Sequence, residues 1–143
     1  MKINIAINGY GRIGRCITRA LYESEKFYNK INLVAINEMA DEKTIYHLTK
    51  YDSTHGRFPL NVENEKSFLV IGNQRIKIFQ EKNIVNLPWK DLNIDIVLDC
   101  TGVYKDRESA ELHLLSGAKK VIFSQPAEDE MMLLLFMAST ITY

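Results

Sequence analysis

The chain has 143 residues, of which 46% are hydrophobic and 25% charged, an ordinary composition for one globular domain with a core. Basic and acidic residues number 18 each, so the zero net charge gives no general reason to bind nucleic acid or an anionic membrane. The two cysteines, Cys16 and Cys100, lie far apart without metal-ligand spacing, which argues against a disulfide scaffold and a metal site. No apolar run resembles a signal peptide or a membrane span, so we expect a cytoplasmic protein.

The first half of the chain is predicted to alternate between strands and helices. Short apolar runs predict strands, and apolar residues at helical spacing predict helices. Asp41 is the expected N-cap of the second helix. The predicted elements are a strand over 3–7, a helix over 12–24, a strand over 33–36, a helix over 41–50 and a loop over 51–57.

In the second half, short strands separated by turn residues predict an antiparallel insertion, after which strand and helix alternate again. The predicted elements are strands over 60–62, 68–71 and 75–79, a turn opened by Pro88, a strand over 94–99, a helix over 106–116 that ends at Gly117, and a strand over 120–124. Strands that alternate with helices imply parallel β–α–β units. The sequence therefore predicts an α/β fold of the Rossmann type, a doubly wound and mostly parallel sheet with a small antiparallel insertion.

The run Gly9-Tyr10-Gly11-Arg12-Ile13-Gly14 joins the first predicted strand directly to the first predicted helix. In this context G-x-G-x-x-G is typical of a dinucleotide-binding turn. Gly9 permits the tight turn, Gly11 lets a pyrophosphate approach the backbone, and Gly14 lets the helix pack close to the strand. The free amides around Arg12 and Ile13, at the positive end of the helix, favour an anion. The alternative is a glycine-rich turn that binds nothing.

Two further strand ends carry residues suited to a dinucleotide. Glu38 follows the strand over 33–36 at about the 20-residue spacing of the carboxylate that binds the adenosine ribose, and a carboxylate there favours NAD over NADP. Spacing alone leaves open that Glu38 is an exposed residue at the start of a loop. Thr101 and Gly102 follow the strand over 94–99, and ligands of open α/β sheets lie outside such carboxyl ends. A plain connection between strand and helix is the alternative there.

Five stretches resemble the glyceraldehyde-3-phosphate dehydrogenase superfamily in order and spacing, over about residues 2–126. They are Ile7-Asn8-Gly9-Tyr10-Gly11-Arg12-Ile13-Gly14-Arg15, Lys50-Tyr51-Asp52-Ser53-Thr54-His55-Gly56-Arg57-Phe58, Asn86-Leu87-Pro88-Trp89, Asp99-Cys100-Thr101-Gly102-Val103-Tyr104 and Gly117-Ala118-Lys119-Lys120-Val121. Within the superfamily, residues 20–24 and 34–41 are more similar to the D-erythrose-4-phosphate dehydrogenase branch. Glu38-Met39 stands where glyceraldehyde-3-phosphate enzymes typically have Asp-Pro, and Tyr104 where they usually have Phe.

The resemblance implies NAD as the cofactor and a sugar-phosphate aldehyde as the substrate. D-erythrose 4-phosphate is the expected substrate, with glyceraldehyde 3-phosphate as the alternative. Intact members are homotetramers that assemble largely through their catalytic domain. The expected cofactor contacts are Gly9, Gly11, Arg12, Ile13, Gly14, Asn37, Glu38, Lys82 near the adenine where the family more often has Arg, and Thr101, Gly102 and Ser124 towards the nicotinamide.

The catalytic apparatus of the family is not visible in this sequence. Its mechanism needs a cysteine nucleophile in a Ser-Cys-Thr-Thr-Asn run and a later histidine base. No such run occurs, and neither Cys16 nor Cys100 stands in that context. We therefore expect residues 1–130 to form the NAD-binding domain, the catalytic domain to be absent and the chain alone to be inactive. A non-catalytic NAD-binding relic is the alternative.

The resemblance stops near residues 126–131, and 131–143 form an apolar tail unlike the family. Codons compatible with residues 131–139, shifted by one base, read Asp-Ala-Thr-Val-Val-Tyr-Gly-Ile, which resembles the family's next strand. We hypothesise that the tail is a frameshift product, which the coding DNA would reveal.

Overall fold

A computed structural model describes residues 1–103 and 106–124. The tail expected over 131–143, and the expected domain's residues from 125 to 130, lie outside the described residues. The main strands are β1 (Ile3–Asn8), β2 (Ile31–Asn37), β5 (Val62–Glu65), β6 (Phe68–Ile71), β7 (Gln74–Phe79), β8 (Ile96–Asp99) and β9 (Lys120–Phe123). The helices are α1 (Arg12–Glu23), α2 (Glu25–Lys30), α3 (Glu42–Lys50) and α4 (Arg107–Leu115), with a 3-10 turn, η1 (Ile84–Asn86).

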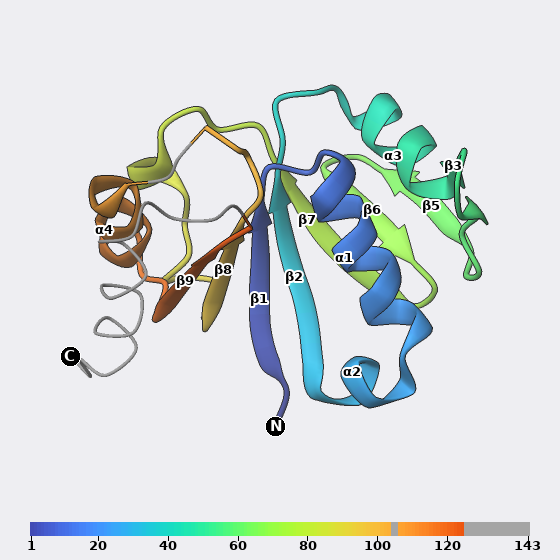
Figure 1. Ribbon diagram of the computed structural model, residues 1–143, viewed down its shortest axis with the longest axis horizontal. Coiled ribbons are helices and arrows are strands. Elements are labelled where there is room, and N and C mark those ends of the chain that lie inside the picture. The colour runs from blue at the N-terminus through green and yellow to red at the C-terminus, as the bar shows by residue number, and fades with distance from the viewer. Residues whose placement is uncertain (104–105, 125–143) are drawn as a thin grey trace.

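The main strands form a seven-stranded sheet in the order β5-β6-β7-β2-β1-β8-β9 (Figure 1). The pairs β2–β7, β1–β2, β1–β8 and β8–β9 are parallel, whereas β5–β6 and β6–β7 are antiparallel. The predicted doubly wound, mostly parallel α/β fold is therefore confirmed. The predicted antiparallel insertion extends the main sheet at one edge, because β7 pairs with both β6 and β2.

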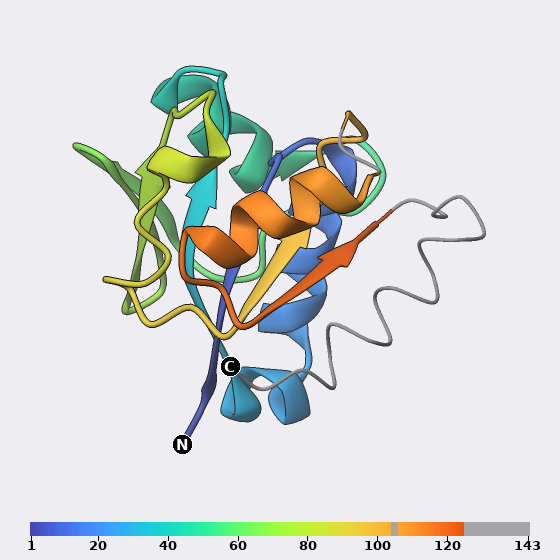
Figure 2. The ribbon, with the colours of Figure 1, turned by 90° about the vertical axis from the view of Figure 1, so that its left-hand side faces the viewer.

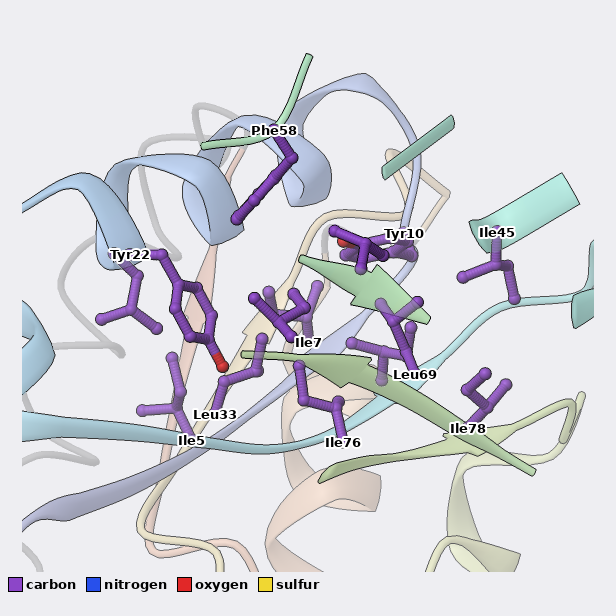
Figure 3. Packing of buried hydrophobic residues seen from close by; sticks show 14 residues of the cluster. Ile5, Ile7, Tyr10, Tyr22, Leu33, Ile45, Phe58, Leu69, Ile76 and Ile78 are labelled. Atoms are coloured by element: carbon purple, nitrogen blue, oxygen red, sulfur yellow. The ribbon is translucent and has the colours of Figure 1, made fainter. Parts of the chain in front are cut away.

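The core lies on both faces of the sheet because alternate residues of a strand point to opposite faces. Ile5 and Ile7 of β1 pack in one cluster with Leu21 of α1, as the close view in Figure 3 shows for the two isoleucines. Ala6, between them, packs in a second cluster with Trp89. Accordingly, α1 and α4 cover opposite faces of the sheet (Figure 1, Figure 2).

Two glycines fix how α1 leaves β1. Gly9 has a φ of +88°, which L-residues rarely adopt, and a Cβ atom there would lie 2.6 Å from the amide nitrogen of Thr101. A Cβ atom on Gly14 would lie 2.7 Å from the carbonyl oxygen of Gly9. The turn is therefore packed against the end of β8 on one side and against its own helix on the other.

The structure differs from the predicted elements at several places: α2 and η1 are not among the predicted elements, and β8 begins at Ile96 and not at 94. Residues 51–57 form a small hairpin, β3 (Tyr51–Asp52) and β4 (Gly56–Arg57), where a loop is predicted. The carboxylate of Asp52 accepts hydrogen bonds from the amides of Thr54 and His55, which closes the hairpin loop. The first strand of the antiparallel segment begins at Val62 and not at 60. Among the described residues, no helix has the length and apolar character needed to cross a membrane.

We predict that Gly14→Ala lowers the free energy of unfolding by about 2 kcal/mol, because the new methyl group meets backbone and forces α1 away from β1. Gly11→Ala is the matched control, since a Cβ atom there meets nothing within 4 Å and the change at this N-cap should cost less than about 1 kcal/mol. Urea denaturation of both variants measures the difference. Equal stability of the two variants would contradict the packing described.

Candidate functional site

The carboxyl ends of three adjacent parallel strands carry a row of buried polar side chains. Asn37 ends β2, Asn8 ends β1 and Asp99 ends β8, and the pairing places Asn8 directly between the other two. Asn37 Nδ2 donates to Asn8 Oδ1 at 2.8 Å, and Asn8 Nδ2 donates to Asp99 Oδ2 at 3.0 Å. Ligands of open α/β sheets bind along this edge, so the row lies where a ligand is expected.

The carboxylate of Asp99, at one end of this row, accepts several hydrogen bonds. Its Oδ1 accepts from the amide and the hydroxyl of Thr101 at 3.1 and 2.7 Å, and its Oδ2 lies 3.0 Å from His113 Nε2 as well as from Asn8 Nδ2. Burial alone raises the pKa of Asp99, but hydrogen bonds from His113, Thr101 and Asn8 outweigh it, so the pKa lies below its usual value. Asp99 is therefore an ionised carboxylate inside the protein.

The start of α1 is arranged differently from the other helix starts. The helices α2, α3 and α4 each have a side-chain cap and an acidic residue in the first turn, with caps from Ser24, Asp41 and Asp106. Helix α1 begins after Gly11 with no side-chain cap and no acidic residue in its first turn. Its first amides and the positive end of the helix dipole are therefore left to an anion from outside the helix.

Open space lies in front of that helix start. A Cβ atom on Gly11 would find no protein atom within 4 Å, in contrast to the crowded positions of Gly9 and Gly14. No packing within the described residues therefore requires glycine at residue 11. A side chain there would fill the space through which a pyrophosphate reaches the backbone amides, so the residues present fit a dinucleotide.

The side chain of Arg12 points to the β3–β4 hairpin. Its guanidinium donates to Asp52 Oδ2 at 2.6 Å and to Thr54 Oγ1 at 3.0 Å. Backbone hydrogen bonds, foremost from His55, and the charge of Arg12 lower the pKa of Asp52, so the ion pair involves a full carboxylate. Arg12 therefore offers a ligand its backbone amide, while its charge is paired with the hairpin.

Glu38 faces the glycine-rich turn. Its Oε2 accepts a hydrogen bond from the amide of Tyr10 at 2.8 Å, and its Oε1 accepts from the amides of Met39 and Ala40 at 2.8 and 3.2 Å. The Tyr10 ring is buried beneath the turn, where its hydroxyl accepts from Thr49 Oγ1 of α3 at 3.1 Å. The hydrogen bond to Tyr10 thus holds the Glu38 carboxylate against the turn, and the contact with Thr49 anchors the turn to α3.

A cleft of about 290 Å³ opens beside these groups at the carboxyl edge of the sheet. Its lining includes expected contact residues from the first turn, from the ends of β2 and β8 and from the segment after β7, namely Gly9, Asn37, Glu38, Lys82 and Thr101. Gly11, Arg12, Ile13, Gly14, Gly102 and Ser124 lie outside this lining. Among these, Gly14 serves packing, and Ser124 continues the ladder by donating its amide to Asp99 O at 3.0 Å.

Other lining residues were not predicted from the sequence, namely Asn8, Met39, Glu81, Ile84 and Val103. Glu81 is fixed by Asn37, whose side chain bonds to both its amide and its carbonyl at 2.8 and 2.9 Å. A signal for Asn8 was present: β1 and β2 both end in Ala-Ile-Asn, at residues 6–8 and 35–37. A polar residue at the same place in two otherwise apolar parallel strands indicates a shared role at the edge of the sheet.

We predict a pH effect from Asp99. Because its pKa is lowered in the folded chain, its stabilising contribution is fully present above the unfolded pKa of about 3.9 and is lost as the pH falls through the lower folded value. Asp99→Asn should therefore lower stability at pH 7 and flatten the decline of stability below about pH 4, measured by urea denaturation. Asp91→Asn, at an exposed position, is the control. A wild-type slope in Asp99→Asn would contradict the assignment.

The cleft, the open helix start and the facing carboxylate agree with a comparison to known families. The family model described as glyceraldehyde 3-phosphate dehydrogenase, NAD binding domain, matches residues 3–107. That span includes β1, the glycine-rich turn, Glu38 and the end of β8, and it covers most of the chain. NAD is accordingly the cofactor, and the chain belongs to the glyceraldehyde 3-phosphate dehydrogenase family through its NAD binding domain.

Proposed function

We propose that NAD binds across the carboxyl edge of the sheet, with its pyrophosphate at the start of α1. The observation that carries this proposal is the uncapped, acid-free first turn of α1 with open space at Gly11. The proposed contacts are Gly9, Gly11, Arg12, Ile13 and Gly14 around the pyrophosphate, Asn37, Glu38 and Lys82 on the adenosine side, and Thr101, Gly102 and Ser124 on the nicotinamide side.

Glu38 is proposed as the residue that selects NAD over NADP. One amide of the turn, from Tyr10, and two amides of its own loop, from Met39 and Ala40, hold its carboxylate, so it cannot move aside without losing these hydrogen bonds. A carboxylate fixed beside the ribose accepts hydrogen bonds from its hydroxyls and repels a 2′-phosphate. The side chain of Lys82 is exposed on the rim of the same cleft, where it can reach the outer face of an adenine.

We further propose that the whole enzyme from which this domain derives oxidises a sugar-phosphate aldehyde, D-erythrose 4-phosphate to 4-phosphoerythronate. When bound, NAD supplies the acceptor for the hydride. The residues of this chain bind and orient the cofactor at the edge of the sheet. Glu38-Met39, in place of the Asp-Pro typical of glyceraldehyde 3-phosphate enzymes, supports the erythrose branch. Glyceraldehyde 3-phosphate is the second candidate substrate.

A binding module without turnover is the second candidate for this chain by itself. Residues 1–143 contain no Ser-Cys-Thr-Thr-Asn run, in which the family carries its nucleophile. Cys100 is a poor substitute, because burial raises the pKa of its thiol and so lowers the fraction of reactive thiolate at neutral pH. Cofactor binding and aldehyde oxidation are therefore expected to separate in experiments on this chain.

Replacing Gly11 tests the proposed pyrophosphate site. We predict that Gly11→Val weakens NAD binding at least about 100-fold in isothermal titration calorimetry, because the side chain fills the approach to the amides of α1. Thermal unfolding is the control and should change little, since a Cβ atom at residue 11 has free space. Unchanged NAD affinity in a folded Gly11→Val variant would place the cofactor elsewhere.

Turnover is tested separately by following NADH absorbance with the purified chain. With D-erythrose 4-phosphate or glyceraldehyde 3-phosphate as substrate, we predict that no NADH forms, while calorimetry of the same sample still detects NAD binding. NADH production that depends on either aldehyde would contradict the proposed binding module and reopen the search for a nucleophile within residues 1–143.

A further inference from the structure

We propose that His113 of α4 is a positioning residue for the dinucleotide site. Through Asp99 it fixes Asn8 and Thr101, two residues that line the cleft. The proposal rests on the proposed location of NAD in this cleft. His113 itself is completely buried and does not line the cleft, so any effect on NAD must pass through the side chains it contacts, chiefly Asp99 at 3.0 Å and also Asn8 at 3.5 Å.

The hydrogen-bond partners of His113 determine which ring nitrogen carries the proton. Trp89 Nε1 lies 3.1 Å from His113 Nδ1, and an indole N–H can only donate. Nδ1 must therefore be the unprotonated acceptor, which leaves the proton of the neutral ring on Nε2. That nitrogen lies 3.0 Å from Asp99 Oδ2 and donates to it. The ring is thus held in one tautomer and one orientation by partners on both sides.

Asp99 transmits this orientation to the cleft. Its Oδ2 accepts from both His113 and Asn8, and its Oδ1 accepts twice from Thr101, so the carboxylate cannot rotate without breaking bonds to both lining residues. Asn8 in turn accepts a 2.8 Å hydrogen bond from Asn37, another lining residue, which is therefore held by the same network. The hydrogen bond from His113 to Asp99 thereby helps to fix three lining residues, namely Asn8, Thr101 and Asn37.

The types of residue buried on α4 support this role of His113. The buried residues of this helix are Ser109 and His113, so its deepest contacts with the rest of the protein are polar. Burying an imidazole costs free energy unless both ring nitrogens find partners, whereas an apolar side chain would fill the space without that requirement. A donor for Asp99 is a function that an apolar side chain cannot supply.

Two substitutions separate the donor to Asp99 from the packing of the ring. In His113→Gln the amide nitrogen reaches about as far as Nε2, so a donor to Asp99 is retained. In His113→Asn the amide oxygen can replace Nδ1 as the acceptor for Trp89, but the side chain is too short to donate to Asp99. The two variants remove similar amounts of ring packing and keep opposite hydrogen bonds.

We expect His113→Gln to bind NAD within about threefold of the wild type, and His113→Asn to bind about tenfold more weakly, the effect of losing one hydrogen bond to a charged group. Calorimetry at pH 7 gives the affinities, and thermal unfolding of the same samples without NAD reports stability. Equal NAD affinity of the two folded variants would overturn the proposal, and so would affinities that merely follow the unfolding temperatures.

Nitrogen NMR of the ¹⁵N-histidine-labelled full chain provides a readout that does not depend on NAD. A protonated Nε2 and an unprotonated Nδ1 are expected for His113, and the opposite tautomer would overturn the proposal. The Gly11→Val variant tests the proposed NAD site independently of the role of His113. If it abolishes NAD binding while the His113 variants bind equally, the proposed site stands and the role of His113 falls. If it has no effect, the proposed site itself is wrong.

Discussion

The buried, ionised carboxylate of Asp99 is the constraint on which the carboxyl edge of the sheet depends. A charge removed from water must be surrounded by donors, and four hydrogen bonds from three separate segments of the chain meet this need. Asn8 reaches it from the neighbouring strand, Thr101 from the following loop and His113 from the helix beyond. The carboxylate therefore ties together the elements that form the cleft, and it places their polar groups at fixed positions before any ligand binds.

Two kinds of helix start occur in this domain, and their difference has a physical meaning. At the start of α3, the side chain of Asp41 accepts a hydrogen bond from one of the first free amides. An acidic residue in the first turn complements the positive end of the helix dipole. At α1 neither device is present, and the backbone turns through two glycines that are crowded by protein and one that is not. The crowded glycines shape the turn, and the uncrowded one leaves its amides open. The charge of Arg12 is paired with Asp52, so the contribution of Arg12 to an anion at this turn is its backbone amide.

The sequence predicted the elements whose determinants are local. The helix over 42–50 followed from Asp41, which does accept a hydrogen bond from the amide of Thr44, and the glycine-rich turn does join a strand to a helix. The hairpin at 51–57 is not predicted, because its polar, glycine-containing run also suits a loop. Asp52 stabilises the hairpin through contacts that a linear pattern does not show, with the amides of Thr54 and His55 and the guanidinium of Arg12. The row of Asn37, Asn8 and Asp99 is not predicted from the sequence, because its hydrogen bonds join side chains of three different strands. No property of Asn8 alone shows that Asp99 is its neighbour, since the pairing register decides this.

The polar row also constrains when the site can form during folding. Asn8 and Asp99 are 91 residues apart in the chain, and Asn8 and His113 are 105 apart. Contacts of such separation form late, after local helices and neighbouring strands, because closing a long loop costs entropy first. During synthesis, the first strand and its glycine-rich turn leave the ribosome long before their partner carboxylate is made. The row of buried polar side chains can therefore be complete only after β8 and α4 have reached β1.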